Sequence, residues 1–299
     1  MSWKKPLLFI VVALLSAAPA AAGAPDHPII ERTVSIRNDG GRIAGTLTMP
    51  GRVRGSIPGV LLFHGFTGTR DELPVLGTDD TMYTRTARAL AEAGIASLRI
   101  DFRGSGESTG TFNETTFSGQ ISDARAALDY LDRLRKVDDR LAVIGLSQGG
   151  LVAASIADDP RLDSVVLWSP VANPVDTYKT ILGAETVLGG LTAESTHIVL
   201  PWGAEIDLDR PFFEDVFAVD PVAEITAYEG PLQVIVGSRD TLVTPQPYYG
   251  QVYLNYHDGD EELVVVDGDH VFDVLSGNGP AVMDEVIGES LDWLAATLG

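Results

Sequence analysis

The chain of 299 residues contains no cysteine. This absence excludes disulfide bonds, thiolate metal sites, a cysteine nucleophile and a lipid-modified cysteine at an export cleavage site. Basic residues are also scarce, with 21 lysines and arginines against 42 aspartates and glutamates, and the formal net charge is −21. Binding to nucleic acid needs clustered basic side chains that neutralise phosphates, so the composition argues against such a partner.

An extended apolar run lies at the N-terminus, from Leu7 to about Ala18, after Lys4 and Lys5 and before the small residues "APAAAGA". The run is shorter than the roughly 20 residues of a membrane-spanning helix, which disfavours an uncleaved anchor. Basic, apolar and then small residues are typical of a secretory signal peptide. We therefore predict a signal peptide over residues 1–24, cleavage near Ala24, export to the periplasm or outside the cell, and no stable membrane insertion afterwards.

Residues 25–299 have the composition of one globular domain, since 45 % of the chain is hydrophobic. The alternating segments "RTVSIR" and "GRIAGTLTMP" flank the turn "NDGG". Alternation of polar and apolar residues on both sides of such a turn predicts an antiparallel hairpin.

Six further segments are short, continuously apolar and rich in β-branched residues, which is typical of strands in a buried parallel sheet. They are Gly59–Gly65, Ile95–Gly104, Leu141–Ser147, Ser164–Pro170, Leu232–Ser238 and Glu262–Gly268. Apolar residues at a spacing of three and four predict helices over residues 81–94, 118–136, 148–159 and 282–298. This alternation predicts an α/β fold, with a mostly parallel twisted sheet and helices on both faces.

The interval from about 171 to 230 interrupts the alternation of strands and helices. It is rich in glycine, proline, acidic and large apolar residues. Loops longer than roughly 12 to 15 residues inside a domain are usually functional. We predict a partly helical cap inserted over the strand ends, the alternative being a surface insertion without a role.

The segment "VIGLSQGG" places Gly145, Ser147 and Gly149 in a G-x-S-x-G pattern, after a predicted strand and before a predicted helix. That context is the one in which the pattern forms a nucleophile elbow, a strained turn that exposes the serine oxygen above the sheet. The alternative is a glycine-rich turn with an ordinary capping serine. We predict that Ser147 is a nucleophile.

A serine nucleophile needs a base and an orienting acid. After a nucleophile elbow, the acid, Asp or Glu, comes next in the chain and the His base follows it. Asp240 comes just after one predicted strand and His270 just after the next, so both lie at the same edge of the sheet as Ser147. Asp267 and Asp269 are close to His270 in sequence, but we expect them to be solvated or to form turns.

The other four histidines have weaker claims to the role of base. His27 lies at the expected mature N-terminus, and His257 lies in a polar turn where we expect it to be solvated. His197 lies in the predicted cap, where it contacts substrate or packs. His64 opens the "HGFTG" turn, and we expect it to brace that loop.

The negative charge of a tetrahedral intermediate is best stabilised by backbone N–H groups. In this type of site one donor follows the nucleophile and the other lies in the loop after a neighbouring strand. We therefore predict an oxyanion hole formed by the N–H groups of Gln148 and Phe66. We expect the Phe66 side chain to pack at the acyl pocket, and Thr67 and Thr69 to stabilise the loop.

With these motifs the chain resembles the α/β-hydrolase superfamily, and within it the cinnamoyl or feruloyl esterase-like and serine-aminopeptidase-like hydrolases. The resemblance extends from "HGFTGTRDE" through "GLSQGG" to "GSRDTLVTP" and "GDHVF". It implies the same roles for Ser147, His270, Asp240, Phe66 and Gln148, and in the esterase group the insertion shapes a pocket for an aromatic acyl group. This chain departs from that group at the residue before the serine, where the leucine of "GLSQGG" replaces the common histidine.

These residues predict cleavage of small-molecule carboxylic esters through an acyl-enzyme, with aryl or cinnamoyl-type esters as candidate substrates and no metal or organic cofactor. A histidine base has an ordinary pKa of about 6.5, so activity is expected to rise from mildly acidic to slightly alkaline pH. The alternatives are a short-peptide aminopeptidase that uses acidic cap residues to bind an amine, a dienelactone or thioester hydrolase, and a non-catalytic binding protein. The residues of the acidic cap cluster are Glu205, Asp207, Asp209, Glu214 and Asp215.

Overall fold

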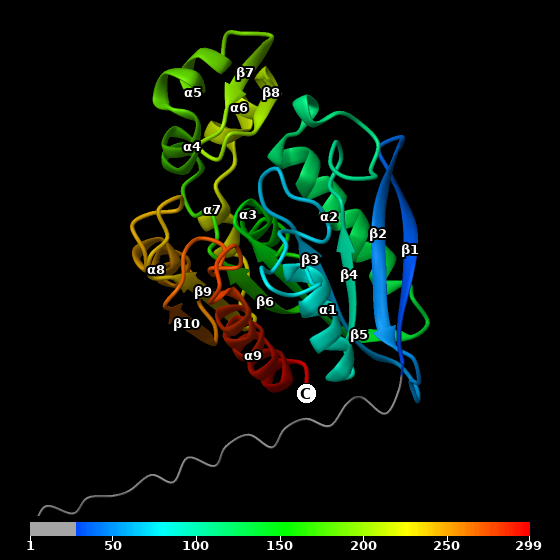
Figure 1. Cartoon of the computed structure of the whole chain (residues 1–299). Coiled ribbons are helices and arrows are strands. Elements are labelled where there is room, and N and C mark those ends of the chain that lie inside the picture. Colours follow the sequence, from blue (N-terminus) through cyan, green and yellow to red (C-terminus); the bar gives the residue numbers. More distant parts are fainter. Residues whose placement is uncertain (1–27) are drawn as a thin grey trace, which may run out of the picture.

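An eight-stranded sheet forms the centre of the protein in a computed structural model that describes residues 28–299 (Figure 1). Its strands, in spatial order, are β1 (Ile29–Asn38), β2 (Gly41–Pro50), β4 (Ala96–Ile100), β3 (Ile57–Phe63), β5 (Val137–Leu146), β6 (Leu162–Trp168), β9 (Leu232–Gly237) and β10 (Glu261–Val266). All pairings from β4 to β10 are parallel, whereas β2 is antiparallel to both of its neighbours. The predicted mostly parallel sheet is confirmed, and the predicted signal peptide lies outside the described residues.

The predicted N-terminal hairpin is formed by β1 and β2, which pair from Ile29 with Pro50 to Asn38 with Gly41. Its two central turn residues, Asp39 and Gly40, have φ angles of 47° and 79°. Positive φ at both positions is the feature of a type I′ turn, whose twist matches that of the strands. The sequence "NDGG" therefore sets the register of this hairpin.

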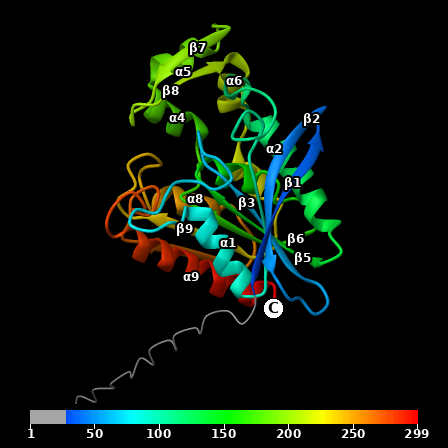
Figure 2. The ribbon, with the colours of Figure 1, turned by 45° about the vertical axis from the view of Figure 1, so that its right-hand side comes forward.

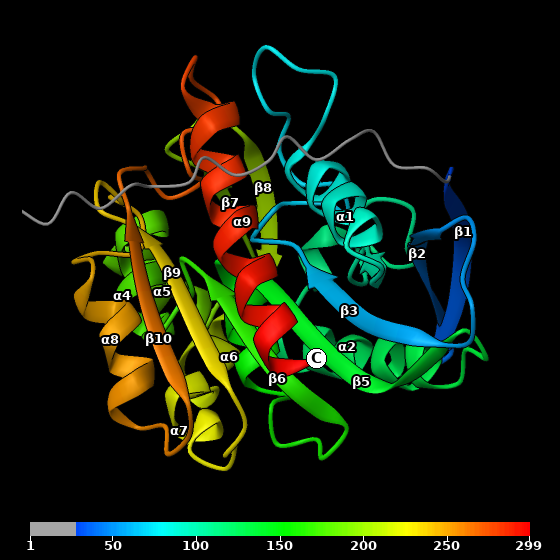
Figure 3. The same ribbon diagram turned by 90° about the horizontal axis from the view of Figure 1, so that it is seen from below.

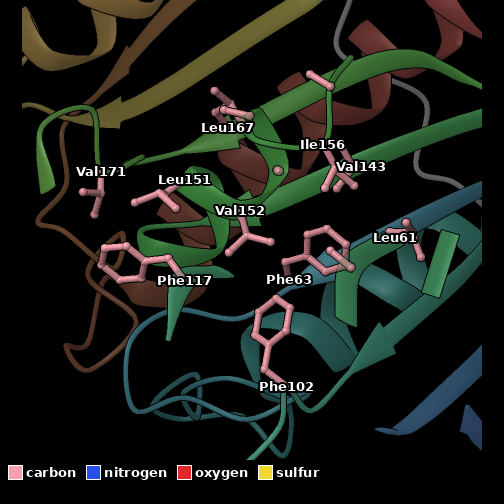
Figure 4. Close-up of a cluster of buried hydrophobic side chains, with 14 of the residues drawn as sticks. Leu61, Phe63, Phe102, Phe117, Val143, Leu151, Val152, Ile156, Leu167 and Val171 are labelled. Atoms are coloured by element: carbon pink, nitrogen blue, oxygen red, sulfur yellow. The ribbon is translucent and has the colours of Figure 1, made fainter. Parts of the chain in front are cut away.

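Helices cover both faces of the sheet (Figure 3). The helices α1 (Met82–Glu92) and α9 (Gly279–Thr297) contribute to one hydrophobic core. The helices α2 (Phe117–Asp132), α3 (Gln148–Ala154) and α8 (Tyr248–Asn255) contribute to the other. Figure 4 shows side chains of this second core, including Phe63 of β3, Phe117 of α2 and Leu151 of α3, all fully buried. The strands between the two layers are apolar on both faces because neither face meets solvent.

The strand β10 differs from its prediction, because the segment around it was expected to be buried on both faces. It pairs with β9 alone and forms an edge of the sheet. Its first two residues are exposed, and Val265 is 46 % exposed. The apolar run "LVVV" matched the pattern of a central strand, but an edge strand has only one neighbour to cover it.

The segment between β6 and β9 forms the inserted cap above the carboxyl ends of the strands (Figure 2). Its elements are α4 (Pro174–Leu182), α5 (Ala184–Gly190), β7 (Ser195–Val199), β8 (Glu205–Asp209), α6 (Arg210–Ala218) and α7 (Pro221–Ile225). The strands β7 and β8 form an antiparallel hairpin that the sequence pattern did not predict. The 3₁₀ turn η1 (Phe112–Glu114) lies against β8, and α6 contacts α2, so the cap is packed onto the main domain.

Within residues 28–299, no helix combines the length and the apolar character that crossing a membrane requires.

Candidate active site

Ser147 lies at the sharp turn between β5 and α3, with a φ angle of 56°. This left-handed conformation is uncommon for a residue with a side chain and is a feature of strained functional turns. The flanking glycines are required by close backbone contacts. A Cβ atom at Gly145 would lie 2.2 Å from the Gly149 carbonyl oxygen, and one at Gly149 would lie 2.1 Å from the Phe63 carbonyl oxygen. The G-x-S-x-G pattern therefore allows the turn to form.

The structure brings together the three side chains of the predicted triad. Ser147 Oγ lies 2.9 Å from His270 Nε2, and His270 Nδ1 lies 2.7 Å from Asp240 Oδ2. Asp240 follows β9 and His270 follows β10, so the parallel strands deliver both loops to the edge of the sheet that carries Ser147. All three residues are less than 9 % exposed.

The environment of Asp240 defines the tautomer of His270. Asp240 Oδ1 accepts hydrogen bonds from the N–H groups of Leu242 and Val243, at 2.8 and 2.9 Å. A carboxylate held in this way can only accept, so His270 Nδ1 carries the proton and donates it to Oδ2. His270 Nε2 is then free to accept the hydroxyl proton of Ser147, which is the arrangement a general base needs.

The two predicted oxyanion donors lie on either side of the nucleophile. Gln148 follows Ser147 directly, and Phe66 belongs to the loop of residues 64–73 after β3, named here the β3 loop. A Cβ atom at Gly65 would lie 3.5 Å from Ser147 Cβ, so this loop passes close to the serine. Within residues 28–299, neither the Phe66 N–H nor the Gln148 N–H donates a hydrogen bond to a protein atom. Both donors are therefore available to a ligand.

His64 braces the β3 loop, as predicted. The Phe102 N–H donates to His64 Nε2 at 3.1 Å, so Nδ1 carries the proton and donates to the Gly65 carbonyl oxygen at 2.8 Å. Burial lowers the pKa of the His64 imidazole, which keeps the ring neutral.

The remaining candidates lie outside the catalytic geometry, and one prediction about them is wrong. Asp267 is exposed and paired with Arg239, and the Asp269 carboxylate accepts backbone N–H groups of its own turn. His197 is exposed and pairs with Asp207 at 3.0 Å. His257 was expected to be solvated, but it is only 6 % exposed, because its turn folds against Gly230 and Nε2 contacts that carbonyl oxygen at 2.8 Å. His27 lies outside the described residues.

The sequence analysis missed Glu72, a carboxyl group that lines the pocket beside Ser147. Its Oε1 accepts the Gly65 N–H. Burial raises the pKa of Glu72 to about 7, although the N–H groups of Gly65 and Leu73 and the nearby His270 oppose this shift. Glu72 follows "HGFTGTRD" as one of several charged residues, so no spacing rule distinguished it from a solvated side chain.

The Gln148 side chain joins the elbow to the cap through a chain of buried hydrogen bonds. The Tyr178 hydroxyl of α4 donates to Gln148 Oε1. Gln148 Nε2 in turn donates to Gln120 Oε1 at 2.6 Å, and Gln120 Nε2 donates to Thr115 Oγ1 at 3.2 Å. The residue that carries one predicted oxyanion donor is therefore fixed by groups from the cap and from α2.

A pocket of about 310 Å³ opens above Ser147 and His270. Its walls are mainly apolar and come from the β3 loop, the elbow, the cap and the loops after β9 and β10. The lining residues are Gly65, Phe66, Thr67, Gly68, Glu72, Leu73, Leu146, Ser147, Ile181, Trp202, Leu242, His270, Val271 and Leu275. Phe66 lines this pocket, and its ring packs against Phe112, Tyr178 and Phe212.

The acidic cap residues are not in this pocket. Glu205 and Asp207 line a separate hollow with Thr67 and Phe112. Asp215 accepts hydrogen bonds from the backbone N–H and the hydroxyl of Ser118, at 2.7 and 3.0 Å. Within residues 28–299, no cluster of three or more His, Asp or Glu side chains is arranged to hold a metal ion.

Comparisons with known proteins agree with this architecture. Residues 75–201 match the family described as "Serine aminopeptidase, S33", a range that contains Ser147 but neither Asp240 nor His270. The chain is 28 % identical over 251 residues to Esterase EstD of Thermotoga maritima, a match that covers 79 % of this chain and 59 % of EstD. It is also 31 % identical over 112 residues to an uncharacterized 31.7 kDa protein of Escherichia coli, with 36 % of each chain covered. The matched part of the chain thus spans less than two thirds of the length of these two relatives.

Two solved structures share the fold. Est1E from Butyrivibrio proteoclasticus, solved with ferulic acid bound, has a TM-score of 0.71 at 22 % sequence identity, covering 88 % of this chain and 99 % of that one. The Pyrococcus furiosus esterase Pf2001 has a TM-score of 0.64 at 23 % identity, covering 91 % and 94 % of the two chains. With its sheet order, its elbow and these similarities, the chain has the α/β-hydrolase fold.

Proposed function

We propose that the protein is a serine hydrolase that cleaves small carboxylic esters. The observation that carries this proposal is the continuous chain of hydrogen bonds from Asp240 through His270 to Ser147, with distances of 2.7 and 2.9 Å. A serine hydroxyl is a weak nucleophile unless an adjacent base takes its proton. This chain supplies that base and holds it in the required tautomer.

The reaction proceeds in two acyl-transfer steps. Ser147 Oγ attacks the ester carbonyl carbon while His270 Nε2 takes the hydroxyl proton, and Asp240 stabilises the imidazolium that forms. His270 then donates this proton to the leaving alcohol, and an acyl-enzyme remains on Ser147. Water, activated by the same imidazole, attacks the acyl-enzyme and releases the acid.

The oxyanion of each tetrahedral intermediate is bound by the N–H groups of Phe66 and Gln148. Their proximity to Ser147 and their lack of partners within residues 28–299 support this role. Removing one donor of this kind typically costs about 10²- to 10³-fold in turnover. No metal ion or organic cofactor is needed for these steps.

The acyl group of the substrate is an apolar one, of aryl or cinnamoyl type. The pocket wall beyond Ser147 consists mainly of aliphatic side chains and Trp202, and its volume of about 310 Å³ suits a group of moderate size. Burial of such a group is favourable at about 25 cal/mol per Å² of apolar surface. The similarity in fold to Est1E, which was solved with ferulic acid bound, gives independent support for this class.

Esterase activity is favoured over aminopeptidase activity, which the family description suggests. An aminopeptidase needs a carboxylate near the scissile bond to bind the substrate ammonium group. The cap acids Glu205 and Asp207 line a different hollow, and Glu72 already accepts the Gly65 N–H. An aminoacyl anilide is therefore expected to be a poor substrate.

The test is hydrolysis by residues 25–299 and by its Ser147→Ala variant, with p-nitrophenyl esters of increasing chain length, methyl ferulate and an aminoacyl anilide. We expect ester turnover in the wild type and a loss of at least about 10⁴-fold in the variant. Preference for methyl ferulate or an aryl ester supports the acyl assignment. Cleavage of the anilide alone would favour the peptidase, and no cleavage or fluorophosphonate labelling of Ser147 would indicate a binding protein.

We also propose that residues 1–24 direct export and are removed near Ala24. The order of basic, apolar and small residues supports this proposal. N-terminal sequencing of the protein recovered from the periplasm and the medium of an expressing bacterium tests it. An intact Met1 terminus on protein found only in the cytoplasm contradicts it.

A further inference from the structure

Gly65, the residue before the proposed donor Phe66, is held by hydrogen bonds on both of its sides. Its N–H donates to the Glu72 carboxyl group. Its carbonyl oxygen accepts from His64 Nδ1 at 2.8 Å and from the Gly68 N–H at 3.1 Å. A trans peptide is planar, so the Phe66 N–H points away from the Gly65 carbonyl. The contacts to the carbonyl oxygen therefore fix the direction of the Phe66 N–H, and the Glu72 contact fixes the preceding peptide plane, so that Gly65 is held on both sides.

Glu72 carries two features that cost stability. Its carboxyl group is partly buried, and its backbone has a φ angle of 61°, in the left-handed region that glycine adopts more readily. An ordinary loop residue would avoid both costs. Strain of this kind is retained mainly where the local geometry serves the site. The carboxyl group also fits closely, since a Cβ atom at Gly68 would lie 2.7 Å from Glu72 Oε1.

The titratable groups that face Glu72 are His270, from the loop after β10, and Tyr83, from α1. The Tyr83 hydroxyl donates to the Phe63 carbonyl oxygen at 2.7 Å, so it has its own partner. Burial, and to a smaller extent the charge of Glu72, raise the pKa of Tyr83 well above its usual value, which keeps it neutral. His270 is therefore the group whose charge changes near Glu72 during a catalytic cycle.

We propose that Glu72 is a positioning residue of the oxyanion hole, whose carboxyl group holds the Gly65 N–H and thereby orients the Phe66 N–H toward the oxyanion formed on Ser147. This proposal rests on the proposed function. A carboxylate is a stronger acceptor than a neutral group, so the contact is firmest when Glu72 is ionised. The ionised form also lies close to His270, whose charge favours it.

The test compares Glu72→Ala, Glu72→Gly and Glu72→Gln with the wild type in ester hydrolysis. We expect the alanine and glycine variants to lose about 10- to 100-fold in kcat with KM changed less than about threefold, since the lost contact matters in the transition state. Glycine relieves the strained backbone but supplies no acceptor, so it is not expected to restore activity. Glutamine keeps one acceptor oxygen, and we expect its kcat to be within about fivefold of the wild type.

The pH profile separates positioning from general stability. In Glu72→Gln the acidic limb of kcat/KM is expected to lose one ionisation, because the titrating carboxyl group is gone. The matched control is Glu107→Gln, which removes an exposed carboxylate paired with Arg70 outside the pocket. Its kcat and pH profile are expected to equal those of the wild type.

A measurement independent of turnover is the amide chemical shift of Gly65 by NMR between pH 5 and 9. We expect it to titrate in the wild type and to stay constant in Glu72→Gln. A Gly65 amide that ignores pH in the wild type, or a glycine variant with wild-type kcat, would overturn the proposal and leave the esterase function standing. If the Gly65 amide titrates but the wild type cleaves no ester, the contact is real and the proposed function is wrong.

Discussion

The loops at the carboxyl edge of the sheet and the cap above them are held by different kinds of contact. At the elbow, backbone atoms approach so closely that Gly149 admits no Cβ atom, and buried polar groups such as Asp240 are fully hydrogen-bonded. In the cap, aromatic rings around Phe212 provide the packing, and charged pairs such as His197 with Asp207 are exposed. Close backbone contacts restrict the choice of residue more tightly than side-chain packing does. This explains why the elbow has a recognisable G-x-S-x-G motif and the cap has none.

The largest expected effect contrasts two glycines, one in each region. Gly149→Ala would place a methyl group 2.1 Å from the Phe63 carbonyl oxygen, and we expect a loss of more than about 3 kcal/mol in unfolding free energy together with ester turnover. Gly189→Ala in the cap helix α5 meets no atom within 4 Å and is expected to stabilise the protein by about 0.5 kcal/mol. Urea unfolding measures the free energy of unfolding of each variant. Equal losses in Gly149→Ala and Gly189→Ala would contradict the expected difference between the elbow and the cap.

Removal of an aromatic ring tests the packing of the cap. Phe212 is fully buried and contacts Phe66, Phe117 and Tyr178, so Phe212→Ala is expected to cost about 3 to 5 kcal/mol. The control is Phe217→Ala, whose ring is 44 % exposed and whose loss we expect to cost less than about 1 kcal/mol. Chemical denaturation compares the two variants, and a similar midpoint for both would show that the ring cluster does not hold the cap.

Stability against pH tests the partly buried carboxyl group of Glu72 in the β3 loop. The pKa of Glu72 is about 7 in the folded protein against an ordinary value of 4.5, so the folded state binds its proton more tightly. The contribution of Glu72 is most favourable below pH 4.5 and is lost as pH rises through 7, by about 3 kcal/mol in all. Relative to Glu72→Gln, the wild type should lose unfolding free energy over this range. If urea unfolding gives the same difference between the two proteins at pH 4.5 and at pH 8, the raised pKa of Glu72 is refuted.

The smallest effect is expected from the exposed ion pair of the cap. A double-mutant cycle with His197→Gln and Asp207→Asn is expected to give a coupling energy below about 1 kcal/mol, because solvent screens both side chains. Turnover should be unchanged, since neither residue lines the pocket. A large loss of activity in either variant would give the hairpin of β7 and β8 a direct part in the site.

Much of the domain and of the site was predictable from the sequence because it depends on local patterns. The buried strands follow from apolar runs, the first hairpin from "NDGG", and the positions of Ser147, Asp240 and His270 from the strand that precedes each. The hairpin of β7 and β8 was missed, because its strands are only five residues long and largely exposed, although β8 alternates polar and apolar residues as "EIDLD". The burial of His257 depends on Gly230, which is distant in sequence, and the contact of Glu72 with Gly65 depends on how the β3 loop folds back, so no local pattern reports either.

The chain of hydrogen bonds through Gln148 limits how caps can be exchanged between proteins that share this fold. A foreign cap grafted between β6 and β9 must deliver a hydroxyl group where Tyr178 places one, or the Gln148 side chain beside Ser147 loses one of its two hydrogen-bond partners. At Tyr178, a change made for specificity also changes the surroundings of the proposed nucleophile.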